Sequence, residues 1–258
     1  MLLVHGFTGS RDAWGTELIE VLARSMRVVR VDLPGHGDSQ KWADPRRYAL
    51  EMVVGELLGV LDQVGARRPI WIGYSLGGRI SLGAAVLHPE RVGALVLEGA
   101  SPGLSGRDER ETRVLEDEGV AKMLEREGVE AFVDYWMSLP LFVSQRRLAP
   151  ELLARERERR LRNSPAALAA CLRGLGTGVQ PTFWDALPDV RVPALLIAGK
   201  EDTKFRAISE RMAEAMPSAE TRVIPGCGHT THLENPKAWL AAVQHFSQRL
   251  EVMEGEER

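Results

Sequence analysis

The chain has 258 residues, 44% of them hydrophobic and 27% charged, and a net charge of −3 at pH 7. This composition is typical of a globular protein with one sizeable core, and it excludes a general electrostatic attraction to nucleic acid or to an anionic membrane. The two cysteines, Cys171 and Cys227, lack the spacing of a zinc site or a disulfide framework, and the N-terminus lacks a signal sequence, so we expect a cytoplasmic protein without a metal centre.

Strands alternate with helices in the first part of the chain. Apolar runs predict strands at 2–4, 27–32, 70–73 and 92–98. Helical spacing predicts helices at 17–24, at 44–64, and from the end of the third strand to His88. This alternation predicts an α/β fold with a mostly parallel sheet and helices on both faces.

The pattern changes over residues 103–187, where no strand is predicted. Charged helical segments at 107–126, 129–137 and 151–162 indicate a helical cap inserted into the α/β core. The core comprises residues 1–102 and 188–250, with further strands at 194–199 and 221–224 and helices at 208–216 and 237–250. Residues 251–258 form a polar tail.

A G-x-S-x-G motif, Gly73-Tyr74-Ser75-Leu76-Gly77, joins the third strand to the helix that follows it. A serine on such a sharp turn adopts a strained backbone and projects its hydroxyl above the sheet, and larger residues at the two glycine positions would collide. The motif therefore marks Ser75 as a candidate catalytic residue.

A serine hydroxyl reacts at neutral pH only when a base takes its proton. Asp202 and His229 each follow a predicted strand, and the chain order serine, acid, histidine is that of an α/β-hydrolase core. We therefore predict a Ser75–His229–Asp202 triad; the alternative is that Asp202 only caps a loop and His229 only occupies a turn. The backbone N–H groups of Leu76 and Phe7 are the expected oxyanion donors.

Arg79 lies one helical turn after Ser75, at a helix N-terminus that is already positive. A cation there needs a negative partner. The sequence allows two such partners for Arg79. One is an internal carboxylate, with Glu98 the obvious candidate, and the other is an anionic substrate above Ser75.

Several motifs together resemble those of the 2-succinyl-6-hydroxy-2,4-cyclohexadiene-1-carboxylate synthase family, α/β-hydrolase-fold lyases of menaquinone biosynthesis. The resemblance covers nearly the whole chain and is carried by His5–Ser10, Asp32–Gly37, Gly73–Arg79, Glu98–Leu104, Trp136–Phe142, Gln180–Trp184, Gly199–Phe205 and Gly228–His229. It implies elimination of pyruvate from 2-succinyl-5-enolpyruvyl-6-hydroxy-3-cyclohexene-1-carboxylate, a substrate with three carboxylates, without a cofactor. The fold of this family usually begins with an antiparallel pair of strands, which we expect to be missing here.

The resemblance also implies residue roles. Ser75 would be the base, activated by His229 and Asp202, and the N–H groups of Phe7 and Leu76 would face the ketone oxygen. The positions that match the family's substrate-binding residues are Arg79, Arg113, Arg162, Tyr74, Trp136 and Phe142.

Two other functions remain open from the sequence. The same triad would serve a serine hydrolase, either a carboxylesterase or a carbon–carbon bond hydrolase, and a non-catalytic binding module could keep the pocket as a receptor. The partner that we expect is a small polycarboxylate, with no nucleic acid and no membrane, bound by a monomer or a weak homo-oligomer.

Overall fold

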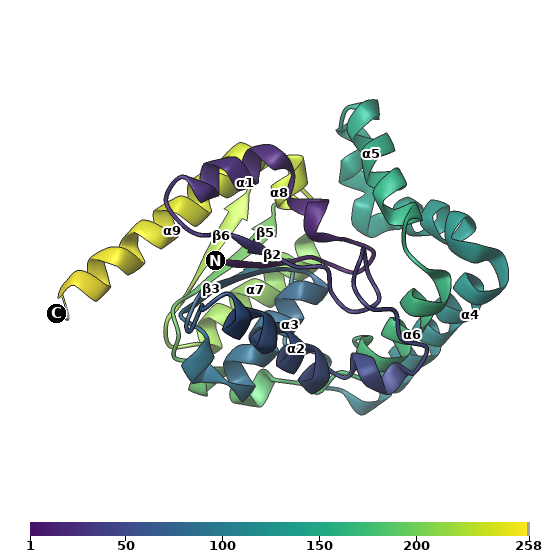
Figure 1. Ribbon diagram of the computed structural model, residues 1–258, viewed down its shortest axis with the longest axis horizontal. Helices are drawn as coiled ribbons and strands as arrows, with labels where there is room; N and C mark the ends of the chain where they lie inside the picture. Colours follow the sequence, from purple (N-terminus) through teal and green to yellow (C-terminus); the bar gives the residue numbers. More distant parts are fainter. Residues whose placement is uncertain (257–258) are drawn as a thin grey trace.

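The computed structural model describes residues 1–256 and contains one sheet of six parallel strands (Figure 1). Because every pair is parallel, the carboxyl ends of the strands meet at one edge of the sheet. The strands lie in the order β2 (Val29–Arg30), β1 (Leu2–Val4), β3 (Ile70–Tyr74), β4 (Ala94–Glu98), β5 (Ala194–Gly199) and β6 (Ala219–Ile224). The predicted parallel α/β architecture is confirmed.

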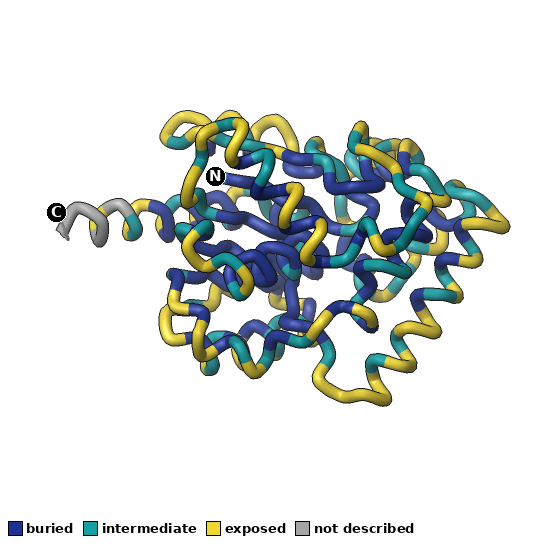
Figure 2. The backbone as a smooth tube through the Cα atoms, turned by 60° about the horizontal axis from the view of Figure 1, so that its bottom comes forward, coloured by how far each residue is buried: buried dark blue, intermediate teal, exposed yellow. Residues whose placement is uncertain are grey.

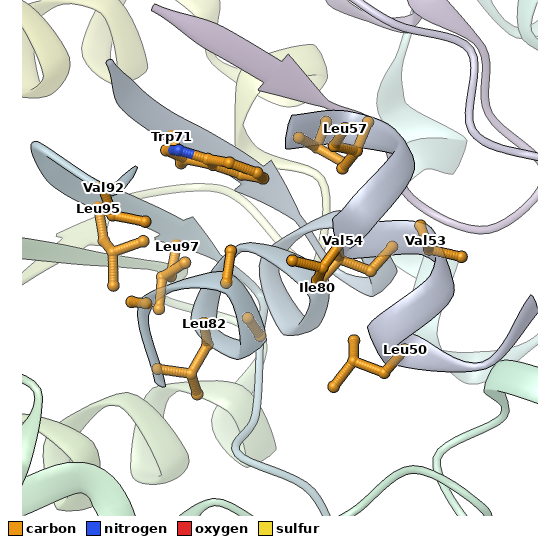
Figure 3. Packing of buried hydrophobic residues seen from close by; sticks show 14 of the residues in the cluster. Leu50, Val53, Val54, Leu57, Trp71, Ile80, Leu82, Val92, Leu95 and Leu97 are labelled. Carbon is orange, nitrogen blue, oxygen red and sulfur yellow. The ribbon is translucent and has the colours of Figure 1, made fainter. Parts of the chain in front are cut away.

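Helices cover both faces of the sheet because the strand side chains alternate between two apolar clusters. Trp71 belongs to one cluster and its neighbour Ile72 to the other. Helices α1 (Thr16–Ala23) and α9 (Pro236–Glu256) cover one face, and α2 (Leu50–Gln63), α3 (Leu76–Leu87) and α7 (Thr203–Ala215) cover the other (Figure 1). Figure 3 shows Val54 of α2 and Ile80 of α3 in the same cluster as Trp71.

The segment between β4 and β5 is helical and lies beyond the carboxyl ends of the strands (Figure 1). It contains α4 (Arg107–Ser138), the 3-10 segment η4 (Pro140–Arg147), α5 (Pro150–Leu161) and α6 (Pro165–Leu175). A small apolar cluster of its own, including Phe132 and Leu168, joins α4 to α6. We call residues 103–187 the cap. Figure 2 shows buried residues concentrated in the middle of the molecule and exposed residues along its outside.

Short elements complete the described chain: η1 (Arg11–Trp14), η2 (Pro45–Tyr48), η3 (Pro89–Arg91), η5 (Trp184–Asp189) and α8 (Thr231–Glu234). Within residues 1–256, no helix is both long and apolar enough to cross a bilayer. The described sheet contains no antiparallel pair of strands.

Several predicted boundaries were wrong. The single helix expected at 44–64 is interrupted by Ala49, whose extended backbone (φ −53°, ψ 143°) separates η2 from α2. Helix α7 begins five residues earlier than the expected start at 208, because Asp202 Oδ1 accepts a hydrogen bond from the Phe205 N–H at 3.2 Å. The last helix continues beyond 250 to Glu256, so most of the expected tail is helical, and residues 257–258 lie outside the described residues.

Candidate active site

Ser75 occupies a strained turn between β3 and α3. Its backbone has φ 51° and ψ −110°, a conformation that few residues other than glycine adopt. A Cβ atom at Gly73 would lie 2.4 Å from the Gly77 carbonyl oxygen, and one at Gly77 would lie 2.0 Å from the Val4 carbonyl oxygen. The two glycines of the motif therefore let α3 pack closely enough on β1 and β3 to hold Ser75 at the end of the sheet.

The structure brings Ser75, His229 and Asp202 together. His229 Nδ1 lies 2.6 Å from Asp202 Oδ2, and His229 Nε2 lies 3.2 Å from Ser75 Oγ. When the carboxylate accepts the Nδ1 proton, Nε2 is left with a lone pair that can accept the serine proton. Both the histidine and the acid are buried. This arrangement can remove the hydroxyl proton of Ser75 and hold the resulting imidazolium.

The His229 ring is fixed by residues that the sequence analysis did not single out. Gly99 has φ 55°, and a Cβ atom there would lie 2.8 Å from His229 Cε1. The Phe205 ring packs 4.5 Å from the imidazole, centroid to centroid. The position of Gly99 directly after a buried strand could have indicated a close contact at this point of the site. Nothing in the sequence linked Phe205 to the histidine.

The predicted oxyanion donors lie beside Ser75. Leu76 is the first residue of α3, where backbone N–H groups have no acceptor within the helix. Phe7 follows β1, and both residues line the same cavity as Ser75. His5 holds the Phe7 loop, because its Nε2 accepts from the Leu33 N–H at 3.0 Å and its Nδ1 donates to the Gly6 carbonyl at 2.8 Å.

A cavity of about 420 Å³ lies between the core and the cap, over Ser75 and His229. The three predicted aromatic residues, Tyr74, Trp136 and Phe142, all line it. The Tyr74 hydroxyl lies 2.7 Å from Thr230 Oγ1, and burial raises the pKa of Tyr74, so this side chain stays protonated at neutral pH.

Arg79 also lines this cavity, but Glu98 is not its partner. Its Nη1 donates to the Leu175 carbonyl at 3.2 Å and to Gln180 Oε1. The alternative of an internal ion pair with Glu98 was therefore wrong. Burial, with a smaller contribution from the like charge of Arg113, lowers the pKa of Arg79 to about 10, so the guanidinium remains charged at neutral pH.

The fully buried Glu98 carboxylate is occupied elsewhere. It accepts hydrogen bonds from Thr231 Oγ1 at 2.7 Å, from His232 Nδ1 at 2.8 Å and from Trp239 Nε1 at 3.0 Å. The His232 backbone N–H adds a fourth at 3.1 Å. His232 therefore belongs to a buried network on the far side of the His229 loop.

The two predicted cap arginines have different positions. Arg113 lines the cavity, where its Nε donates to Asp117 Oδ1 at 2.8 Å. Arg162 is exposed at the C-terminal end of α5 and does not line the cavity. The buried cation of that turn is instead Arg160, whose Nη1 lies 3.0 Å from Glu156 Oε2.

Helix α7 contributes two further cations to the cavity wall, Lys204 and Arg211. Neither residue was predicted to belong to the site. The two residues are seven positions apart, with Ile208 between them, so they lie on one face of α7. This signal was missed because the helix was predicted to begin at 208, after Lys204.

The chain is similar to known proteins over nearly its whole length. The sequence model of the alpha/beta hydrolase fold family matches residues 1–236. A Bacillus subtilis protein provisionally named 2-succinyl-6-hydroxy-2,4-cyclohexadiene-1-carboxylate synthase is 42% identical over 246 residues, which cover 95% of this chain and 89% of that protein. The structure of MenH from S. aureus matches with a TM-score of 0.93 and 33% identity, covering 97% of this chain and 93% of that one. A thermophilic esterase from Thermogutta terrifontis matches with a TM-score of 0.82 and 25% identity, covering 96% and 89%.

Proposed function

Since the chain belongs to the alpha/beta hydrolase fold family and, within it, to the 2-succinyl-6-hydroxy-2,4-cyclohexadiene-1-carboxylate synthases, we propose that it is the lyase that forms this compound. The reaction eliminates pyruvate from 2-succinyl-5-enolpyruvyl-6-hydroxy-3-cyclohexene-1-carboxylate, a step of menaquinone biosynthesis. Ser75, His229 and Asp202 are the catalytic residues of this proposal, and the reaction takes place in the cytoplasm.

The elimination begins with a proton transfer at the ring carbon next to the succinyl ketone. That proton passes to Ser75 Oγ while the serine hydroxyl proton passes to His229 Nε2, a transfer that the 3.2 Å separation of the two atoms supports. Asp202, 2.6 Å from Nδ1, stabilises the imidazolium that forms. The serine thus acts as a base and forms no covalent bond to the substrate.

The electron pair released at the ring carbon is delocalised into the ketone as an enolate. The N–H groups of Phe7 and Leu76 face the developing charge on the ketone oxygen. Collapse of the enolate breaks the bond between the ring and the enolpyruvyl oxygen and completes the conjugated diene. The departing enolate takes the proton from His229 and ketonises to pyruvate, which restores the neutral triad.

The half-buried Arg79 is the observation that favours elimination over simple ester hydrolysis. It lies one turn from Ser75 and donates only to neutral acceptors, so its charge is available to a carboxylate of the substrate. A neutral ester would leave this half-buried cation without an anionic partner, which is unfavourable. A polycarboxylate would compensate it.

A direct assay tests the proposed reaction. The purified protein, mixed with the enolpyruvyl substrate, should release pyruvate, measured by coupling to lactate dehydrogenase, as the diene absorbance rises in parallel. Ser75→Ala should lower the rate by roughly a thousand-fold or more. No pyruvate, together with a rapid burst of p-nitrophenolate from a p-nitrophenyl ester, would overturn the lyase assignment and favour a serine hydrolase.

The role of Arg79 has its own test. Arg79→Ala should raise KM by roughly 10- to 100-fold with a smaller effect on kcat, since a charge-assisted hydrogen bond to substrate is lost. Arg91→Ala is the matched control, because Arg91 pairs with Asp62 outside the cavity and should leave KM unchanged. An Arg79→Ala enzyme with the KM and kcat of the original protein would contradict the carboxylate role.

A further inference from the structure

The charges that line the cavity are strongly unbalanced. Four lining residues carry a permanent cation, Arg79, Arg113, Lys204 and Arg211, whereas Glu109 is the single acidic lining residue among those that the structure describes. One of these cations is already compensated, because Arg113 lies 2.8 Å from Asp117. Among the described residues, none of the other three cations, Arg79, Lys204 and Arg211, forms an ion pair with a carboxylate.

Two of those three charges come from α7. Lys204, Ile208 and Arg211 follow one another at helical spacing and all line the cavity, so one face of α7 forms a wall of it. In the part of the chain that the structure describes, neither Lys204 nor Arg211 has a carboxylate within 4.0 Å. By contrast, Arg206 on the same helix does not line the cavity and pairs with Glu210 at 3.8 Å.

Aromatic side chains hold the two α7 cations in place. The Arg211 guanidinium carbon lies 4.3 Å from the centre of the Trp184 ring, and the Trp184 Nε1 donates to the Gly103 carbonyl at 3.1 Å. The Lys204 ammonium lies 5.9 Å from the centre of the Phe205 ring. Stacking on an aromatic face leaves the guanidinium N–H donors free for a ligand.

We propose that Lys204 and Arg211 form a carboxylate subsite on the α7 wall of the cavity. With Arg79 they supply three uncompensated cations for a ligand that carries three carboxylates, a match that rests on the proposed function. In this set Lys204 and Arg211 replace the two cap arginines that the resemblance implied, Arg113, which pairs with Asp117, and Arg162, which is exposed outside the cavity.

The expected effect is on binding and not on the chemical step. Lys204 and Arg211 are exposed at the rim, so each ion pair with ligand is screened by salt and modest in strength. We expect Lys204→Gln and Arg211→Gln each to raise KM by roughly 3- to 10-fold, and the double variant by roughly 10- to 50-fold, with kcat within about two-fold of the original. Arg206→Gln removes the same charge from the same helix and should leave KM unchanged.

A binding experiment separates this proposal from the proposed reaction. Calorimetry measures the affinity for trimellitate, an unreactive benzene tricarboxylate, and for benzoate, at low and at high salt. The double variant should lose about ten-fold in trimellitate affinity at low salt, while Arg206→Gln binds as the original protein does and benzoate affinity barely changes.

Each outcome bears on one proposal. Equal losses in the double variant and in Arg206→Gln, or no loss in either, would overturn the α7 subsite even if pyruvate is released. If no pyruvate is released but the contrast in trimellitate affinity holds, the proposed reaction fails and the subsite stands. Circular dichroism of each variant confirms that it is folded.

Discussion

At the scale of single residues, Asp202 serves two purposes with its two carboxylate oxygens. Oδ1 accepts the Phe205 N–H and caps α7, and Oδ2 lies 2.6 Å from His229 Nδ1. From the sequence, the cap and the triad were alternative roles for Asp202. They are compatible because the two oxygens point to different donors, and the cap itself orients the oxygen that faces the imidazole.

The two purposes of Asp202 can be separated by substitution. Asp202→Asn keeps an oxygen for the Phe205 N–H but presents no second carboxylate oxygen to His229, so kcat should fall by roughly 10³- to 10⁴-fold with little loss of stability. Asp202→Ala should lose the same activity and, in addition, about 1 kcal/mol of unfolding free energy with the cap. Urea unfolding and the pyruvate assay measure the two effects. An active Asp202→Asn enzyme would contradict the triad.

The positions of some cavity cations could be predicted from the sequence, and those of others could not. Arg79 was identifiable because its distance from Ser75 along one helix fixes its place above the sheet. Which arginine of α5 faces inward was not identifiable, since Arg155, Arg157, Arg159, Arg160 and Arg162 leave no apolar periodicity to orient the helix. Only the packing of α5 against the rest of the cap decides that Arg160 is buried and Arg162 exposed.

At the scale of elements, the buried Glu98 joins the end of β4 to α8 and α9. Its carboxylate accepts from Thr231, His232 and Trp239, and its backbone carbonyl accepts the Ser75 N–H at 2.8 Å. Burial alone would raise the pKa of Glu98, but the adjacent His232 and the hydrogen bonds outweigh it and lower that pKa. Glu98 thus links the loop of Ser75, through its backbone carbonyl, to the loop of His229, through its carboxylate.

Glu98→Gln should disturb the contacts of β4 with α8 and α9. The glutamine amide places an N–H₂ group against the N–H and O–H donors that the carboxylate accepts from, so at least one buried hydrogen bond is lost. We expect the unfolding free energy to fall by roughly 2–4 kcal/mol and kcat to be lower. Glu220→Gln is the matched control, because Glu220 pairs with Arg249 at the surface and should change stability by less than about 1 kcal/mol. Equal stability of the two variants in urea would contradict the linking role of Glu98.

Element prediction succeeded where apolar periodicity was strong and failed where packing decided the conformation. Strand β5 (Ala194–Gly199) has the predicted bounds, since six consecutive buried residues follow a proline. Helix α6 was missed although Ser164 and Pro165 mark its start. Gly174 lies within this helix, where a Cβ atom would lie 2.0 Å from the Pro45 carbonyl oxygen, so the glycine serves close packing of α6 on η2.

At the scale of the whole molecule, two buried histidines make folding sensitive to acid. His5 and His36 are fully buried, with rings 5.2 Å apart. Burial lowers the pKa of His36 from 6.5 to about 4 and that of His5 well below its usual value. Below pH 6.5 the unfolded chain binds protons that the folded chain cannot, so stability falls as the pH drops toward 4.

Replacement of His36 tests this dependence. His36→Gln should flatten the decline in unfolding free energy between about pH 7 and pH 4, to which His36 contributes up to about 3 kcal/mol. His245→Gln removes an exposed histidine and should leave the decline unchanged. Urea unfolding at a series of pH values measures the slope, and identical slopes for the two variants would count against the buried histidines as its source.

The cap is fastened to the loop that carries Phe7. Asn163, between α5 and α6, donates from Nδ2 to the Thr8 carbonyl at 3.0 Å, one residue beyond Phe7. The cap therefore supports the loop of one of the two oxyanion donors as well as covering the cavity. A substitution far from Ser75 in sequence, at Asn163, would reach the reaction through this loop.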